Sequence, residues 1–138
     1  MDQSGQMFAP NILIARTGRP VRFTNSDPEL HNINVKNSET KAQSFNVAIP
    51  TGESYSYTFE REGFYNVTCD IHPAMAAEIV VSSSPYVAVS DADGTFALSD
   101  VPEGIYNIKI YAGKDVISKE VSVKGPTTEV KLDGGEVS

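Results

Sequence analysis

The sequence has 138 residues, of which 40% are apolar and 9% aromatic, and this suits one domain or two small ones with a modest core. Its formal net charge of −7 at pH 7 argues against nucleic-acid binding and against attraction to anionic lipid. No apolar run approaches the length of a membrane-spanning helix, and no signal peptide is visible at the start.

The first part of the chain reads as short β-strands separated by turns. Apolar and polar residues alternate within several of these segments, as they do in half-buried strands, and helical periodicity is almost absent. Turn residues separate them at 17–20, 25–28, 50–52 and 62–63. The expected strands cover residues 12–14, 21–23, 33–35, 55–59, 64–67 and 78–81. Residues 36–48 read as irregular, either a loop or a short helix.

The composition of the sequence changes after residue 81, and a serine-rich stretch with Pro85 marks a boundary. We therefore divide the chain into residues 1–83 and 84–138. The second part shows turns at 91–94 and 101–104. Its expected strands cover residues 86–89, 95–98, 105–111, 116–123 and 128–132. Strands at this spacing are typical of an all-β sandwich or barrel.

Residues 69–75, which read CDIHPAM, hold the only cysteine, one of two histidines and one of three methionines. They follow a predicted strand, so they form a loop between two strands. Thiolate and thioether are soft ligands and imidazole suits copper, and one thiolate, two imidazoles and a weak axial thioether describe an electron-transfer copper site. The loop supplies Cys69, His72 and Met75. The second imidazole would have to be His31, the only other histidine.

Two other interpretations of these residues are possible. A zinc site fits less well, because structural zinc favours closed sets of Cys and His ligands rather than Met. Cys69 could instead be an enzyme's nucleophile with His31 or His72 as its base. The sequence offers this thiol neither a helix N-terminus, which would lower its pKa, nor a recognisable set of oxyanion donors.

Two segments together resemble the cupredoxin family. These are VRFTNSDPELHN at 21–32 and GFYNVTCDIHPAM at 63–75. The resemblance covers about residues 7–83, and the short loop is similar to that of amicyanin-like members. It implies a Greek-key β-sandwich that holds one type 1 (blue) copper. By the same resemblance, His31, Cys69 and His72 would be the equatorial ligands, Met75 the axial ligand, and Asn32 would tie the two ligand segments together.

A different family is similar to the second part. Residues 93–106, DGTFALSDVPEGIY, resemble the G-x-F-x-L…V-P-x-G-x-Y pattern of carboxypeptidase regulatory-like, transthyretin-like β-sandwich repeats. We therefore expect residues 84–138 to form a small C-terminal transthyretin-like appendage on a cupredoxin domain of residues 1–83.

The resemblance implies an electron-transfer protein that shuttles single electrons between redox proteins, rather than an enzyme. A copper carrier or sensor is the alternative. We expect a monomer that inserts into no membrane and binds no nucleic acid. Its acidic surface would suit a basic docking patch on a cytochrome or an oxidoreductase. The family resemblance places it outside the cytoplasm, in the periplasm or at the cell surface.

Overall fold

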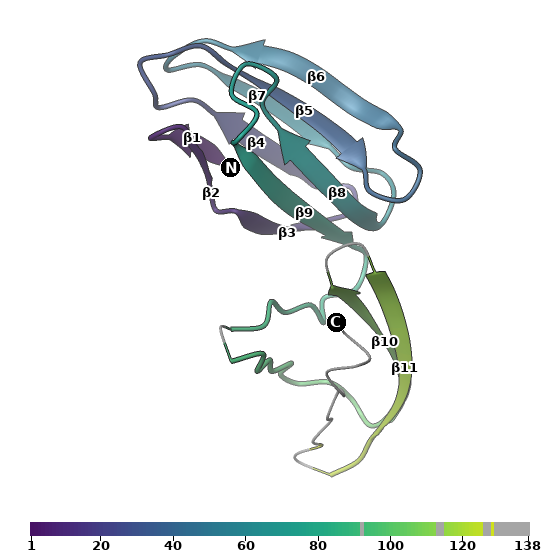
Figure 1. Cartoon of the computed structure of the whole chain (residues 1–138). Coiled ribbons are helices and arrows are strands. Elements are labelled where there is room, and N and C mark those ends of the chain that lie inside the picture. Colours follow the sequence, from purple (N-terminus) through teal and green to yellow (C-terminus); the bar gives the residue numbers. More distant parts are fainter. Residues whose placement is uncertain (92, 113–114, 126–127, 129–138) are drawn as a thin grey trace. The chain divides into compact units, whose positions relative to one another are not determined.

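The computed structural model describes residues 1–91, 93–112, 115–125 and 128 (Figure 1). The chain forms two compact units, Met1–Val87 and Ala88–Ser138. Within the described part of the chain, no helix is long and apolar enough to span a membrane.

The first unit contains nine strands. They are β1 (Asp2–Ser4), β2 (Met7–Ala9), β3 (Ile12–Arg16), β4 (Pro20–Thr24), β5 (His31–Asn37), β6 (Gln43–Ile49), β7 (Ser54–Thr58), β8 (Gly63–Thr68) and β9 (Ala76–Ser82). The six strands expected before residue 82 are all present, each within a residue or two of its expected limits.

These strands form one large sheet and two ribbons. The large sheet has the order β3-β9-β8-β5-β6, in which only the β3–β9 pair is parallel. Strands β4 and β7 form an antiparallel ribbon, and β1 and β2 form another. Backbone N–H groups of Thr24 and Ser26 donate to the carbonyls of Met1 and Gln3, and these bonds join β1 to the end of β4.

The core lies between the large sheet and the β4–β7 ribbon. Phe23 on β4 and Tyr57 on β7 both pack against Phe45 on β6, with ring centroids 5.3 and 4.6 Å apart. Ile33 on β5 and Val67 on β8 have no exposed surface and belong to the same cluster. The unit is therefore a two-layer β-sandwich, which confirms the predicted all-β fold.

The prediction for residues 36–48 was wrong. Strand β5 continues to Asn37, a turn follows, and β6 occupies Gln43–Ile49. Phe45 and Ile49 are buried while the residues between them are more exposed, so β6 is a half-buried edge strand. The burial of its apolar face against the β4–β7 ribbon explains why this polar segment is extended.

Among the described residues of the second unit, β10 (Gly104–Ala112) and β11 (Asp115–Val123) form an antiparallel hairpin, at the place of the strands predicted at 105–111 and 116–123. The strands predicted at 86–89 and 95–98 are wrong, because neither segment forms a strand or pairs with one among the described residues. Tyr86 and Val89 stay exposed, so no buried face stabilises a strand there. Of the strand predicted at 128–132, only residue 128 is described, and it is irregular.

Candidate metal centre

The fold brings the two predicted ligand segments to one end of the large sheet. His31 is the first residue of β5, and residues 69–75 form the loop between β8 and β9. Strands β5 and β8 are antiparallel neighbours, with Asn34 opposite Thr68. The start of β5 and the residue after β8 therefore lie side by side, and this places Cys69 against His31.

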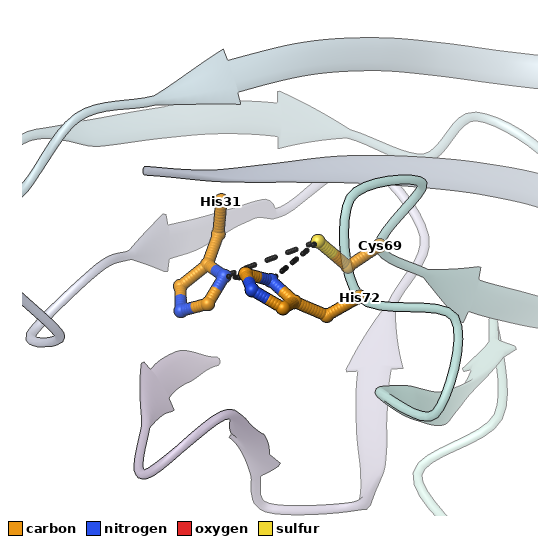
Figure 2. Close-up of side chains that lie close together, drawn as sticks. All are labelled: His31, Cys69 and His72. Atoms are coloured by element: carbon orange, nitrogen blue, oxygen red, sulfur yellow. Dashed lines mark hydrogen bonds between the residues drawn. The ribbon is translucent and has the colours of Figure 1, made fainter. Parts of the chain in front are cut away.

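Three of the four predicted ligands form one cluster (Figure 2). The Nδ1 atoms of His31 and His72 are 3.1 Å apart, and the Sγ atom of Cys69 is 3.9 Å from each of them. His31 and Cys69 are buried, whereas the His72 side chain is 24% exposed. In a triangle with these sides, the point equidistant from the three atoms is about 2.1 Å from each, close to the bond lengths of a divalent metal to imidazole and thiolate.

Carboxylates bind the other nitrogen of each imidazole. The Nε2 atom of His31 is 2.7 Å from Oδ2 of Asp27, and Nε2 of His72 is 3.1 Å from Oε2 of Glu29. An ionised carboxylate can only accept a hydrogen bond, so each Nε2 carries the proton in the neutral imidazole. The two Nδ1 atoms lie 3.1 Å apart, and two nitrogen acceptors at this distance are stabilised by a proton or a metal cation between them.

A tight turn holds Asp27 in place. Gly5 and Gln6 connect β1 to β2, and both have positive φ (60° and 56°), as a two-residue hairpin turn of this kind requires. Their N–H groups donate to the Asp27 carboxylate at 2.6 and 2.9 Å. The pKa of Asp27 lies below its ordinary value, chiefly because of the Gln6 N–H and next because of the bond to His31. The group beside His31 is therefore a carboxylate anion.

Asn32 connects β5 to the loop of residues 69–75. Its Oδ1 accepts hydrogen bonds from the backbone N–H groups of Asp70 (2.7 Å) and Ile71 (3.3 Å), and it lies 3.3 Å from Sγ of Cys69. Its Nδ2 donates to Oδ1 of Asn46 on β6. The prediction that Asn32 joins the two ligand segments is thereby confirmed.

Asp70 is held by side-chain amides rather than by a histidine. Asn34 and Asn46 donate to its two carboxylate oxygens at 3.2 and 3.0 Å, and Gln43 donates in turn to Asn34. The bonds from Asn46 and then Asn34 lower the pKa of Asp70. These hydrogen bonds therefore fix the loop to β5 and β6.

Met75 lies in the same loop as the cluster. Its backbone N–H donates to the carbonyl of His72 at 2.9 Å, so the chain turns tightly between these two residues. Its side chain is only 2% exposed and belongs to the same core cluster as Cys69. The burial agrees with an axial ligand, and the assignment of Met75 as that ligand stays a prediction.

The sequence interpretation missed both carboxylates. Asp27 and Glu29 lie in a polar turn before β5, where acidic residues usually face water. The sequence places Asp27 four residues before His31, and this short separation was one available signal of a contact between them. Nothing in the sequence indicated that Glu29 would meet His72, because that contact depends on how the two loops fold together.

Comparison with known proteins decides the family. A family model described as copper binding proteins, plastocyanin/azurin family, matches residues 1–82. The chain belongs to this family, the cupredoxins. No curated protein matches the chain.

Solved cupredoxin structures share the fold. A purple cupredoxin from Nitrosopumilus maritimus is 32% identical, with a TM-score of 0.51, over 58% of this chain and 86% of that one. An amicyanin variant in its reduced state is 24% identical, with a TM-score of 0.53, over 59% of this chain and 78% of that one. A copper-containing nitrite reductase from Thermus scotoductus SA-01 is 28% identical with a TM-score of 0.54, and the match covers 60% of this chain but only 22% of the reductase.

The donor set of this cupredoxin fits copper. One cysteine sulfur and two imidazoles lie close together, and a buried thioether lies in the same loop as the cysteine. A trigonal set of one Cys and two His with a weak axial ligand is the arrangement of type 1 copper. Family membership and the geometry together support one type 1 copper as the cofactor of this protein.

Proposed function

We propose that this cupredoxin transfers single electrons between redox proteins through one type 1 copper. Its equatorial ligands would be Nδ1 of His31, Sγ of Cys69 and Nδ1 of His72, and the axial ligand would be the sulfur of Met75. The observation that carries the proposal is the convergence of two imidazole nitrogens and a cysteine sulfur within 3.9 Å of one another. When bound, copper would supply the one-electron couple between Cu(II) and Cu(I).

The protein would contribute a rigid frame. Asp27 holds His31, and Asn32 holds the backbone next to Cys69. A donor set that keeps its positions in both oxidation states lowers the reorganisation that electron transfer requires. The loop of residues 69–75 is bonded to β5 and β6 through Asn32 and Asp70, and this supports such rigidity.

His72 would be the route for electrons. Its side chain is 24% exposed, whereas His31 and Cys69 are buried. Ile71, which precedes His72, and Leu30, which precedes His31, are each about half exposed, so an exposed apolar residue adjoins each histidine in the chain. A redox partner with an apolar contact face and a basic rim would suit this surface and the net charge of −7. We propose that the protein works as a monomer outside the cytoplasm, without enzymatic activity of its own.

A copper carrier is the second candidate, because the same residues could bind copper for delivery. Voltammetry and chelator competition on the copper-loaded protein separate the two functions. An electron carrier should give a reversible one-electron wave and should retain its copper when a Cu(I) chelator is present through repeated reduction and oxidation. Loss of copper to the chelator within one reduction cycle would contradict the electron-transfer proposal and favour the carrier.

A further inference from the structure

One loop supplies a carboxylate to each of the two imidazoles. The loop joins β4 to β5 and contains both Asp27 and Glu29. Asp27 lies 2.7 Å from the outward nitrogen of His31, and Glu29 lies 3.1 Å from the outward nitrogen of His72. Two carboxylates therefore lie next to the proposed copper ligands, in addition to the sulfur of Cys69.

The two carboxylates differ in their surroundings. Asp27 is only 6% exposed and accepts bonds from the Gly5 and Gln6 N–H groups as well as from His31. The Glu29 side chain is 50% exposed, and both of its oxygens accept bonds from the side-chain amide of Gln6. Gln6 thus donates hydrogen bonds to both carboxylates, to Asp27 through its backbone N–H and to Glu29 through its side-chain amide.

We infer that Asp27 and Glu29 are anionic positioning residues that lower the reduction potential of the copper centre, Asp27 more strongly than Glu29. The inference rests on the proposed copper site. Negative charge stabilises the doubly charged oxidised metal more than the singly charged reduced metal. Charge interactions are stronger in buried surroundings than beside water, so Asp27 should have the larger effect.

The salt dependence of the reduction potential should distinguish the contribution of Asp27 from that of Glu29. Added salt screens interactions between exposed charges and affects buried ones far less. The effect of Glu29 should therefore shrink as ionic strength rises, while that of Asp27 should persist. A purely structural role for either residue predicts no such dependence.

The test is the reduction potential of the copper-loaded full chain as wild type, Asp27→Asn and Glu29→Gln. Both substitutions keep the shape of the side chain and an oxygen acceptor while removing the charge. Glu39→Gln is the matched control, because Glu39 is exposed and follows the far end of β5, about 20 Å from His31 by the rise of a strand. The visible spectrum of each variant shows whether the copper–thiolate bond is intact.

We expect Asp27→Asn to raise the potential by at least about 59 mV, a tenfold change in the ratio of Cu(I) to Cu(II) affinity. Glu29→Gln should raise it by less, and the rise should shrink between about 0.01 and 1 M salt. Glu39→Gln should leave it unchanged. Potentials that stay the same or fall in both variants, with a normal spectrum, would overturn the inference alone.

Two further outcomes also decide it. If Asp27→Asn fails to bind copper, the surface variant Glu29→Gln decides the inference: a salt-dependent rise supports it and an unchanged potential overturns it. A wild-type protein without a copper–thiolate absorption band would overturn both the inference and the proposed copper site.

Discussion

At the scale of single residues, the predicted copper ligands differ in how far they are exposed. His31, Cys69 and Met75 are each no more than 2% exposed, whereas the His72 side chain is 24% exposed. Cys69 and Met75 belong to the core cluster and His31 is held by the buried Asp27, so the positions of these three side chains depend on the packing of the sandwich. His72 depends instead on the loop and on Glu29. We therefore expect substitutions at the buried ligands to change the metal centre itself, and changes around His72 to alter exchange with partners.

The axial ligand provides the first prediction. In type 1 sites the axial ligand tunes the reduction potential. Met75→Gln replaces a soft thioether with a harder amide oxygen, which favours Cu(II) over Cu(I). We expect copper and its colour to be retained and the potential to fall by about 60 mV or more, a tenfold change in relative affinity. Voltammetry of the copper-loaded variant measures it, and an unchanged potential would mean that Met75 is not a ligand.

The ligands could be predicted from the sequence because Cys, His and Met are so rare in this chain that their clustering has few explanations. Asp27 and Glu29 could not be found in that way. Acidic residues are common in surface turns, and their contact with the imidazoles is made only when the β4–β5 loop meets residues 69–75 in the folded chain.

At the element scale, β1 is tied to the sandwich by a surface carboxylate. Asp2 on β1 accepts hydrogen bonds from the hydroxyls of Thr24 (2.6 Å) and Ser26 (2.8 Å). The bond from Thr24 is the main reason that the pKa of Asp2 lies below its ordinary value of 3.8. The turn that follows β1 holds Asp27, so the attachment of β1 also supports the metal centre.

This attachment predicts a pH dependence. A carboxyl whose pKa is lowered by folding stabilises the folded state above its ordinary pKa, and this contribution is lost as the pH falls through the lower, folded-state value. Asp2→Asn should therefore reduce the free energy of unfolding at pH 7 by less than about 1 kcal/mol, as expected for a partly exposed group.

As the pH falls below the ordinary Asp pKa of 3.8, the difference in stability between wild type and Asp2→Asn should shrink, because the wild-type carboxyl, whose pKa is lower still, becomes increasingly protonated. Urea unfolding of both proteins at neutral and acidic pH measures this difference, and Glu39→Gln serves as a surface-charge control. A difference that grows on acidification would contradict the account.

Strand prediction succeeded where apolar and polar residues alternate between clear turns, as in β4 and β7. It failed at β6, although Phe45, Val47 and Ile49 alternate with smaller or polar residues there. The polar residues before β6 hide this alternation when residues 36–48 are considered as a single segment. Residues 86–89, at the boundary between the two units, have β-type composition but no partner strand in the described part of the chain, and composition alone does not provide one.

At the scale of the whole molecule, the predicted copper site lies entirely within the first compact unit, Met1–Val87. The core cluster that surrounds it consists of residues from β2 to β9 and the loop of residues 69–75. Nothing in the proposed site requires a residue from the second unit.

A shortened chain tests this independence. A protein of residues 1–87 should bind one copper and give the same visible spectrum and, within about twofold, the same Cu(II) affinity as the full chain, because every proposed ligand and hydrogen-bond partner is retained. The measurement is a copper titration of both proteins, with circular dichroism to confirm the β fold. A folded shortened protein with a lost or altered spectrum would place part of the site in the second unit.

We propose above that Cys69, His31 and His72 bind one type 1 copper. The most direct test is the visible and electron paramagnetic resonance spectrum after one equivalent of Cu(II) is added to the full chain, with Cys69→Ser as the control. We expect intense thiolate-to-copper absorption with a narrow copper hyperfine splitting in the wild type, and the loss of both in a folded Cys69→Ser protein. A colourless wild-type product, or a Cys69→Ser protein that keeps the colour, would contradict it.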